Sequence, residues 1–141
     1  MRARAEATIE RPADEVWGRI RDFGDITWIS TTRECTFDGT DRVVTVPGIN
    51  LVITQRLVHH DDVSRTYAYS LVGEIDLQAF MGPGSISRQL DATLAVTPVS
   101  DTASTVNWDF DTEEFAVGPT RAEYQTALDA LKAEMEQVPR S

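Results

Sequence analysis

Apolar and polar residues alternate along most of the chain, and a period of two predicts β-strands. Cys35 and Phe37, for example, alternate with Glu34 and Thr36. Successive side chains on a strand point to opposite faces, so each such segment would turn one apolar face toward a core. Turn-forming Gly, Pro and Asp residues separate the segments. The pattern predicts an antiparallel sheet with strands at residues 3–10, 33–37, 42–46, 49–59, 67–72, 90–96 and 106–110.

Helical spacing appears after the first of these segments. Pro12 suits a first helical turn and is followed by acidic residues that complement the helix dipole, so we expect a short amphipathic helix over about residues 12–22. Residues 25–29 are expected to add one more helical turn, with Trp28 facing inward. The sequence therefore predicts two short N-terminal helices.

A long helix is the last predicted element. Thr120 and Glu123 fit the capping box, in which both side chains accept hydrogen bonds from free N–H groups at a helix start. Apolar residues then recur every three or four positions along one face, at Tyr124, Leu128, Leu131, Met135 and Val138. The order of elements predicts an α+β fold in which a curved antiparallel sheet packs on this C-terminal helix.

Composition narrows the range of partners. The 141 residues suit a single domain spanning residues 1–141. Lys and Arg number 13 against 23 Asp and Glu, and the net charge of −10 argues against nucleic acid and anionic membrane surfaces as partners. No segment approaches the ~20 apolar residues of a membrane span, and the first residues lack the apolar run of a signal peptide. We therefore expect a cytoplasmic protein.

Residues 8–17 (TIERPADEVW), residues 20–24 (IRDFG), the region from Gln55 to Gly73 and the segments 90–98 and 106–108 resemble the START-like superfamily. Bacterial members are called polyketide cyclase/dehydrase-like or SRPBCC proteins. The resemblance covers nearly the whole chain. It implies the helix-grip fold shared with Bet v 1-like proteins, in which a seven-stranded sheet wraps the C-terminal helix and leaves a deep apolar cavity.

The resemblance also implies loops that close this cavity. In plant hormone receptors of the superfamily, a gate loop and a latch loop cover the ligand, and the similar loops here contain Pro47 with Gly48 and Ile75 with Leu77. Their other residues depart from the receptor motifs, which argues against hormone sensing. About ten extra residues at 78–88 lie beside the cavity mouth, and we expect them to form a lid around Gly82, Pro83 and Gly84.

Polar side chains on the predicted inward faces are the candidates for ligand recognition. Arg33, on the face of Cys35 and Phe37, would orient a carboxylate, enolate or carbonyl, or would lie at the rim with its guanidinium in water. Gln55 would hydrogen-bond a ligand carbonyl, or would be satisfied by a buried water or the backbone. Arg88 also points inward if the following strand extends backward in register.

Aromatic side chains form a second group of candidates. Tyr67 and Tyr69 would face the cavity from the sheet, and Tyr124 would approach from the helix. Their phenols would donate to a developing oxyanion, or would pack with satisfied hydroxyls. Trp108 is expected to form part of the wall.

No motif in the sequence predicts a metal or another cofactor. His59 would share the inward face of its strand with Gln55, and the adjacent His60 would point to the opposite face, so the two could not readily share a metal. Cys35, among apolar residues, is expected to be a buried and inert thiol. The chain has no phosphate-binding loop, nucleophile elbow or zinc-protease motif.

Two functional hypotheses remain. In the first, the protein, as a monomer or homodimer, binds a hydrophobic small molecule of polyketide, lipid or polycyclic type in the central cavity. In the alternative, it is a cyclase, aromatase or dehydratase that acts on such a molecule without a metal or nucleotide cofactor. The sequence predicts no carboxylate on an inward face, and the resulting lack of general bases favours binding.

Overall fold

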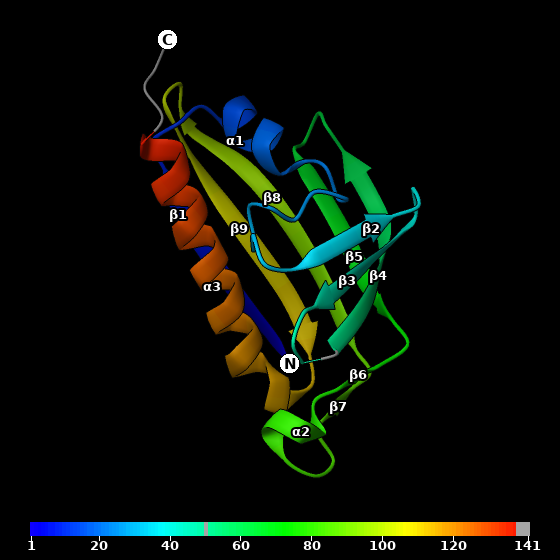
Figure 1. The fold of residues 1–141 in the computed structure, drawn as a ribbon. Helices are drawn as coiled ribbons and strands as arrows, with labels where there is room; N and C mark the ends of the chain where they lie inside the picture. Colours follow the sequence, from blue (N-terminus) through cyan, green and yellow to red (C-terminus); the bar gives the residue numbers. More distant parts are fainter. Residues whose placement is uncertain (50, 138–141) are drawn as a thin grey trace.

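The seven predicted strands, the first helix and the C-terminal helix occur in the predicted order in the computed structural model of the protein, which describes residues 1–49 and 51–137 (Figure 1). Three short elements between residues 75 and 87 are not among the predicted ones. The strands are β1 (Arg2–Ile9), β2 (Glu34–Phe37), β3 (Asp41–Val46), β4 (Leu51–Asp61), β5 (Thr66–Val72), β6 (Ile75–Asp76), β7 (Ile86–Ser87), β8 (Leu90–Ser100) and β9 (Ala103–Thr112). The helices are α1 (Ala13–Ile20), α2 (Gln78–Met81) and α3 (Glu114–Gln137).

One curved antiparallel sheet organises the fold. Among the described residues it contains seven strands, in the order β1-β9-β8-β5-β4-β3-β2, and β6 and β7 pair separately. Figure 1 shows α3 lying along the β1 and β9 side, while β2, β3 and β4 cross on the other side. This arrangement confirms the predicted α+β helix-grip fold.

The core lies between the sheet and the inward faces of α1 and α3. From α3, Tyr124, Leu128 and Leu131 are buried, as the apolar spacing predicts, and Met135 packs partly buried against them. Val138, the last residue of the predicted stripe, lies outside the described residues. Burial of this stripe against the sheet is the main apolar contribution of α3 to stability.

The start of α3 corrects the sequence prediction. The helix begins at Glu114, so Thr120 and Glu123 lie inside it and do not form a capping box. Pro119 lies within the helix and removes only one hydrogen bond. Packing stabilises the residues that α3 has ahead of the predicted start at Thr120, because Ala116 is buried against the rest of the molecule. As a result, the Glu123 carboxylate does not cap the helix start.

The second N-terminal segment forms the one expected turn but not a second helix. Residues 26–30 make a single turn, closed by a 2.9 Å hydrogen bond from the Ser30 N–H to the Ile26 carbonyl. The Asp25 carboxylate accepts hydrogen bonds from both the N–H and the hydroxyl of Thr27. Such side-chain bonds compete with helical hydrogen bonding. Trp28 is nevertheless buried, as expected.

Side chains of α3 cover the free edge of β1. Gln125 donates through Nε2 to the Glu6 carbonyl at 2.9 Å and accepts the Glu6 N–H through Oε1 at 3.2 Å. Lys132 donates to the Thr8 carbonyl at 2.7 Å, and Arg121 donates to the Arg4 carbonyl at 3.0 Å. These are backbone groups that another strand would otherwise bind.

Candidate functional site

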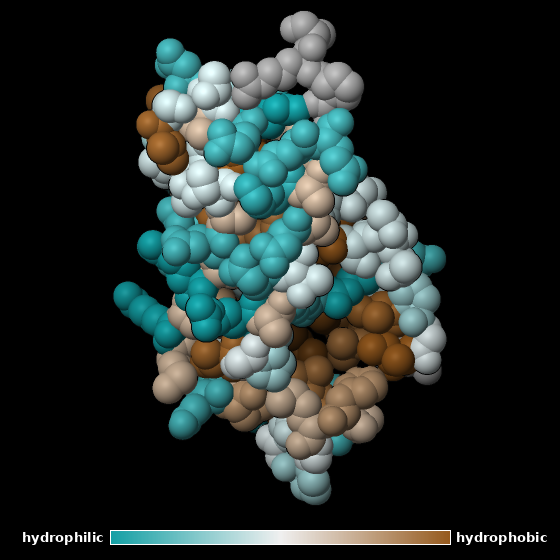
Figure 2. Space-filling view, turned by 90° about the vertical axis from the view of Figure 1, so that its left-hand side faces the viewer, coloured by the Kyte–Doolittle hydropathy of each residue, from teal (hydrophilic) through white to brown (hydrophobic). Residues whose placement is uncertain are grey.

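A pocket of about 370 Å³ opens between the concave face of the sheet, α3 and the turn at residues 26–30. Figure 2 shows the surface hollowed at this place and bordered by hydrophobic side chains. The volume lies within the ~300–1,000 Å³ of small-molecule sites. Apolar residues from several elements form most of its wall, among them Ile26, Ile29, Val44, Ile53, Ile75 and Leu90.

Five of the seven predicted binding residues line this pocket. They are Arg33, Gln55, Tyr69, Trp108 and Tyr124. The other two lie elsewhere. Tyr67 is buried beside the pocket, with its ring tilted against that of Trp17 and edge-to-face with that of Phe23. Arg88 lies between β7 and β8 with its side chain 68% exposed, and it pairs with Glu74 at 3.5 Å. The strand does not extend back to Arg88, so the condition for its inward position is not met.

The predicted closing loops contribute unequally. Ile75 and Leu77 line the pocket, whereas Pro47 and Gly48 are not among its lining residues. Residues 78–88 fold into α2 and β7, and α2 places Phe80 and Met81 on the wall. Both side chains are also exposed, so they form part of the rim.

The predicted lid residues lie beyond this rim. Gly82, Pro83 and Gly84 follow α2 and are not among the lining residues. Gly82 and Gly84 have φ angles of 95° and 85°, a backbone conformation that favours glycine. These residues therefore form a tight turn that holds α2 beside the pocket.

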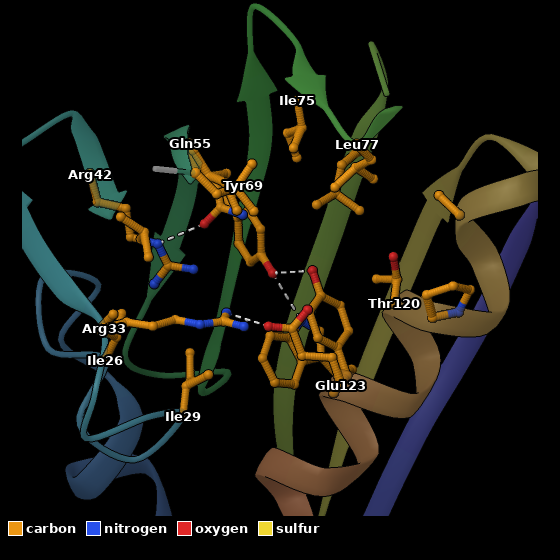
Figure 3. Close-up of a pocket in the computed structure, with 18 of the residues that line it drawn as sticks. Ile26, Ile29, Arg33, Arg42, Gln55, Tyr69, Ile75, Leu77, Thr120 and Glu123 are labelled. Carbon is orange, nitrogen blue, oxygen red and sulfur yellow. Dashed lines mark hydrogen bonds and ion pairs between the residues drawn. The ribbon is translucent and has the colours of Figure 1, made fainter. Parts of the chain in front are cut away.

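Three aromatic residues form a hydrogen-bonded cluster at the inner wall (Figure 3). The Trp108 Nε1–H donates to the Tyr69 hydroxyl at 3.1 Å, and the hydroxyls of Tyr69 and Tyr124 lie 2.8 Å apart. The rings of Trp108 and Tyr124 stack at 3.7 Å. Burial raises the pKa of both Tyr69 and Tyr124, so both phenols are protonated at neutral pH.

Arg42, which the sequence analysis did not single out, lies at the opposite wall. Its side chain is buried, and its Nε donates to Gln55 Oε1 at 2.8 Å while Nη1 donates to the Phe23 carbonyl at 3.1 Å. The guanidinium lies 3.9 Å from the Phe23 ring centre and 5.0 Å from that of Tyr69. The sequence pattern contained this signal, because Arg42 and Val44 are two residues apart on a predicted strand and therefore share a face. In the structure Arg42 lies opposite Gln55 on the neighbouring strand.

An ion pair between Arg33 and Glu123 crosses the pocket in Figure 3 and joins the segment before β2 to α3. The side chains are 28% and 42% exposed, so this pair lies at the solvent side of the pocket. Glu123 corrects the expectation that no carboxylate faces inward. The sequence pattern did not reveal it, because the predicted capping box placed Glu123 at the helix start.

The residues at the other end of β4 also differ from the prediction. A register shift between Leu57 and His59 places His60, rather than His59, opposite Tyr67. The His60 ring stacks on Tyr67 at 6.4 Å, and its Nε2 lies 3.1 Å from the Arg21 carbonyl oxygen. Among the described residues, no group of three or more His, Cys, Asp or Glu is placed to hold a metal ion.

Cys35 is half-buried on the short strand β2 instead of fully buried. Desolvation by burial raises the pKa of its thiol. A raised pKa keeps the thiol protonated at neutral pH and lowers its reactivity. The thiol is not among the groups that line the pocket.

Residues 1–136 match the family model described as polyketide cyclase / dehydrase and lipid transport. The chain belongs to this family. No curated protein sequence matches the chain. Among the described residues of this polyketide cyclase/dehydrase family member, no helix is long and apolar enough to cross a membrane.

Solved structures share the fold of this family member at low sequence identity. The protein XoxI from Bacillus cereus has 19% identity and a TM-score of 0.81, with 99% of each chain covered. The di-domain ARO/CYC BexL from the BE-7585A biosynthetic pathway has 17% identity and a TM-score of 0.73; the match covers 96% of this chain and 46% of BexL. Norcoclaurine synthase from Thalictrum flavum has 16% identity and a TM-score of 0.66, covering 99% of this chain and 89% of the synthase. These likenesses concern the fold.

Proposed function

We propose that the protein binds a hydrophobic small molecule of polyketide, lipid or polycyclic type in the pocket between the sheet and α3. The observation that carries this proposal is a surface-open pocket of about 370 Å³ with mostly apolar walls and a few polar groups facing one another. An apolar ligand gains free energy when it leaves water for such walls. The exposed Phe80 and Met81 at the rim extend the apolar surface that an entering ligand would meet.

A neutral fluorescent probe tests this proposal. N-phenyl-1-naphthylamine should bind with saturable enhancement of its fluorescence, because the pocket removes its rings from water. Ala116→Phe would place a ring in the pocket, since Ala116 is buried on its wall, and should weaken probe binding at least tenfold. Val58→Phe, at an exposed position of β4, serves as the matched control and should bind the probe as the natural chain does.

Equal probe binding by all three proteins would contradict the pocket as the site. Native mass spectrometry of the protein purified from its host is an independent measurement that would identify a physiological ligand. We expect a mass above that of the chain that is lost on denaturation. The same adduct should be absent from the Ala116→Phe variant.

Catalysis in the same pocket is the second candidate function, and Glu123 is the observation that favours it. A carboxylate beside two protonated phenols combines a possible general base with hydrogen-bond donors for a developing enolate. The protein would then direct the cyclisation or dehydration of a linear poly-β-ketone. Glu123→Gln should abolish any change in ring products relative to the reaction without protein, while N-phenyl-1-naphthylamine still binds. Products that do not depend on the protein would leave binding as its function.

A further inference from the structure

Arg42 is a buried cation without a carboxylate partner. Its exposed fraction is 3%, and among the described residues no carboxylate oxygen forms an ion pair with it. Its partners are the neutral Phe23 carbonyl, the neutral Gln55 amide, the Tyr67 hydroxyl and two ring faces. A buried charge is costly unless an opposite charge compensates it. Because Arg42 lines the pocket, a ligand can supply that charge.

The Gln55 amide is oriented by Arg42. Arginine only donates hydrogen bonds, so the Gln55 oxygen must be the atom that faces the Arg42 Nε. The Nε2 amide hydrogens are then left for the pocket, since no described residue accepts a hydrogen bond from them. Gln55 therefore adds a second donor beside the guanidinium.

The aromatic cluster supplies a third donor, as a count of its hydrogens shows. Trp108 donates its Nε1–H to the Tyr69 oxygen, and one phenolic hydrogen forms the bond between Tyr69 and Tyr124. Whichever phenol donates in that bond, the other phenolic hydrogen has no acceptor within the cluster. Both phenols line the pocket, so this hydrogen is available to a ligand.

The carboxylate and the amide oxygen that line the pocket, in contrast, are already engaged. Glu123 is paired with Arg33, and the Gln55 oxygen is bonded to Arg42. The pocket thus contains two guanidinium groups and one carboxylate, a local excess of positive charge in a chain whose net charge is −10. A ligand that offers acceptors and a negative charge matches this arrangement.

We propose that the ligand of this pocket carries an oxyanion, a carboxylate or a delocalised enolate or phenolate, which lies against Arg42 and accepts hydrogen bonds from Gln55 and the phenol cluster. This inference rests on the proposed binding function and adds the chemical class of the ligand. Figure 3 shows the guanidinium of Arg42, the amide of Gln55 and the Tyr69 hydroxyl facing the same space. The apolar body of the ligand lies along the remaining walls.

Three probes that share one ring system test the charge preference. They are 2-naphthoate, the neutral 2-naphthamide and the cationic 2-naphthylmethylammonium, each measured by displacement of N-phenyl-1-naphthylamine at pH 7.5. We expect 2-naphthoate to bind at least tenfold more tightly than 2-naphthamide. The ammonium compound should bind most weakly, because Arg33 and Arg42 repel it and the Glu123 carboxylate is already paired with Arg33.

Gln55→Glu makes the test specific to Arg42. The new carboxylate would lie where the amide now meets Arg42 and would become its counter-ion, so the affinity for 2-naphthoate should fall at least tenfold while that for 2-naphthamide changes little. Arg56→Gln is the matched control. It also lowers the net charge by one, but Arg56 lies next in sequence on the opposite face of β4 and pairs with Asp41 at the surface. This control should keep the preference for 2-naphthoate.

Arg42→Met, which removes the charge and keeps an unbranched apolar side chain, provides a second variant and should bind 2-naphthoate and 2-naphthamide equally. Equal affinities for these two compounds in the natural chain, with both displacing N-phenyl-1-naphthylamine, would overturn the oxyanion proposal and leave the binding function standing. A chain that does not bind N-phenyl-1-naphthylamine at all would overturn the binding function and this inference together. Retention of the preference in both Gln55→Glu and Arg42→Met would also overturn the assignment to Arg42.

Discussion

Tyr69 connects the two walls of the pocket. Its hydroxyl accepts the Trp108 Nε1–H and bonds to the Tyr124 hydroxyl, while its ring lies beneath the Arg42 guanidinium. It is also among the most deeply buried side chains, at 1% exposed. A single side chain therefore both supports the core and orients the groups that a ligand would meet.

We predict that Tyr69→Phe costs more stability than Tyr124→Phe. Loss of the Tyr69 hydroxyl leaves the buried Trp108 N–H without its acceptor, which costs about 1–3 kcal/mol. Loss of the Tyr124 hydroxyl removes one bond but leaves Tyr69 able to accept from Trp108, so it should cost about 1 kcal/mol. Urea unfolding with an unchanged m-value would measure both. Equal losses would show that Trp108 finds another acceptor.

Residue-level prediction from the sequence succeeded where strands are regular. Alternation placed Gln55, Tyr69 and Trp108 on the concave face, and these residues line the pocket. It failed at Arg88, which is not part of a continuous strand, and at the β4 bulge, which reverses the faces of the two histidines. Alternation alone does not reveal where a strand is interrupted, because an inserted residue reverses every face beyond it.

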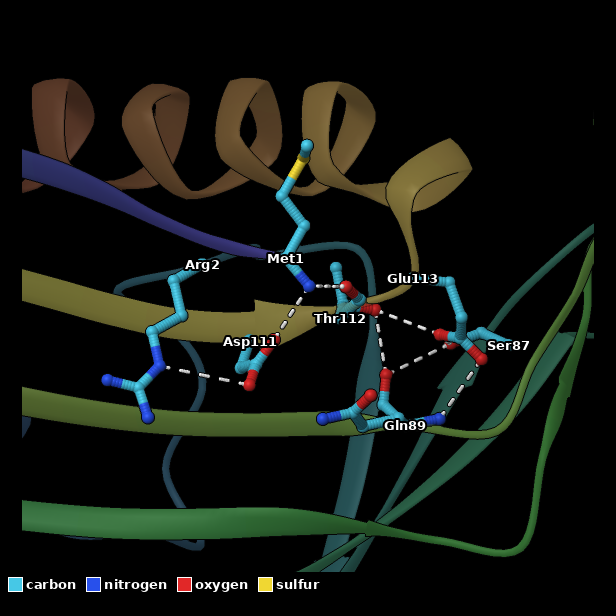
Figure 4. Close-up of polar contacts among 7 residues, drawn as sticks. All are labelled: Met1, Arg2, Ser87, Gln89, Asp111, Thr112 and Glu113. Carbon is cyan, nitrogen blue, oxygen red and sulfur yellow. Dashed lines mark hydrogen bonds and ion pairs between the residues drawn. The ribbon is translucent and has the colours of Figure 1, made fainter.

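At the scale of elements, Glu113 fastens the segment between β7 and β8 to the start of α3 (Figure 4). Its carboxylate accepts hydrogen bonds from the Arg88 and Gln89 N–H groups, from the Ser87 hydroxyl at 2.8 Å and from the Thr112 hydroxyl at 3.1 Å. Desolvation by burial opposes ionisation of Glu113, but these hydrogen bonds outweigh it and lower the pKa to about 2. The carboxylate thus holds the base of the segment that carries α2.

Glu113→Gln should destabilise the protein in a pH-dependent way. The folded-state pKa of Glu113 lies below its ordinary value of 4.5, so the stabilisation is fully present above that value and is lost as the pH falls toward 2. We expect a cost of about 1–3 kcal/mol at pH 7, and this difference from the natural chain should shrink between about pH 5 and pH 2. Unfolding measured by urea across this range tests the prediction. Glu114→Gln, a change at the exposed neighbouring position, should show no such trend.

The predictions of α3 show how far element boundaries follow from sequence. The apolar spacing from Tyr124 onward identified the buried face, because packing of that face stabilises the helix. The true start at Glu114 was missed because local capping chemistry favoured Thr120, while tertiary packing of Ala116 extends the helix through Pro119. Glu123 was lost from the predicted site for the same reason. Local rules identify elements, whereas their ends depend on contacts distant in sequence.

At the scale of the whole molecule, the excess negative charge lies on the outer surface. Acidic residues of the sheet, such as Asp91, Asp109 and Asp111, border a polar groove on the outer face together with Arg2 and Arg4. The pocket on the inner face has the opposite balance, with Arg33 and Arg42 against Glu123. The chain therefore separates a negatively charged exterior from a pocket with a positive balance of charge.

Covering of the β1 edge is a property of the whole molecule, since it joins the first strand to the last helix. Gln125→Ala removes both hydrogen bonds to Glu6 and should cost about 1–2 kcal/mol. Hydrogen exchange of the Glu6 amide should quicken at least tenfold, and light scattering of concentrated solutions should rise because the edge can pair with other chains. Thr126→Ala, next to it on α3 and bonded only within the helix, is the control. Unchanged exchange at Glu6 in Gln125→Ala would show that the edge is protected in another way.

The location of these edge contacts also sets an order for biosynthesis. β1 pairs with β9, and its open side is covered by side chains that follow still later in α3. The ribosome therefore synthesises β1 long before β9 and α3. The first strand cannot make its native contacts until these last two elements have been synthesised. β1 can join the sheet only after translation has passed Thr112, and its open edge is covered only after translation has also passed Gln125 and Lys132. Until then the emerging strand presents free backbone groups, and it is during this interval that a chaperone would have a surface to hold.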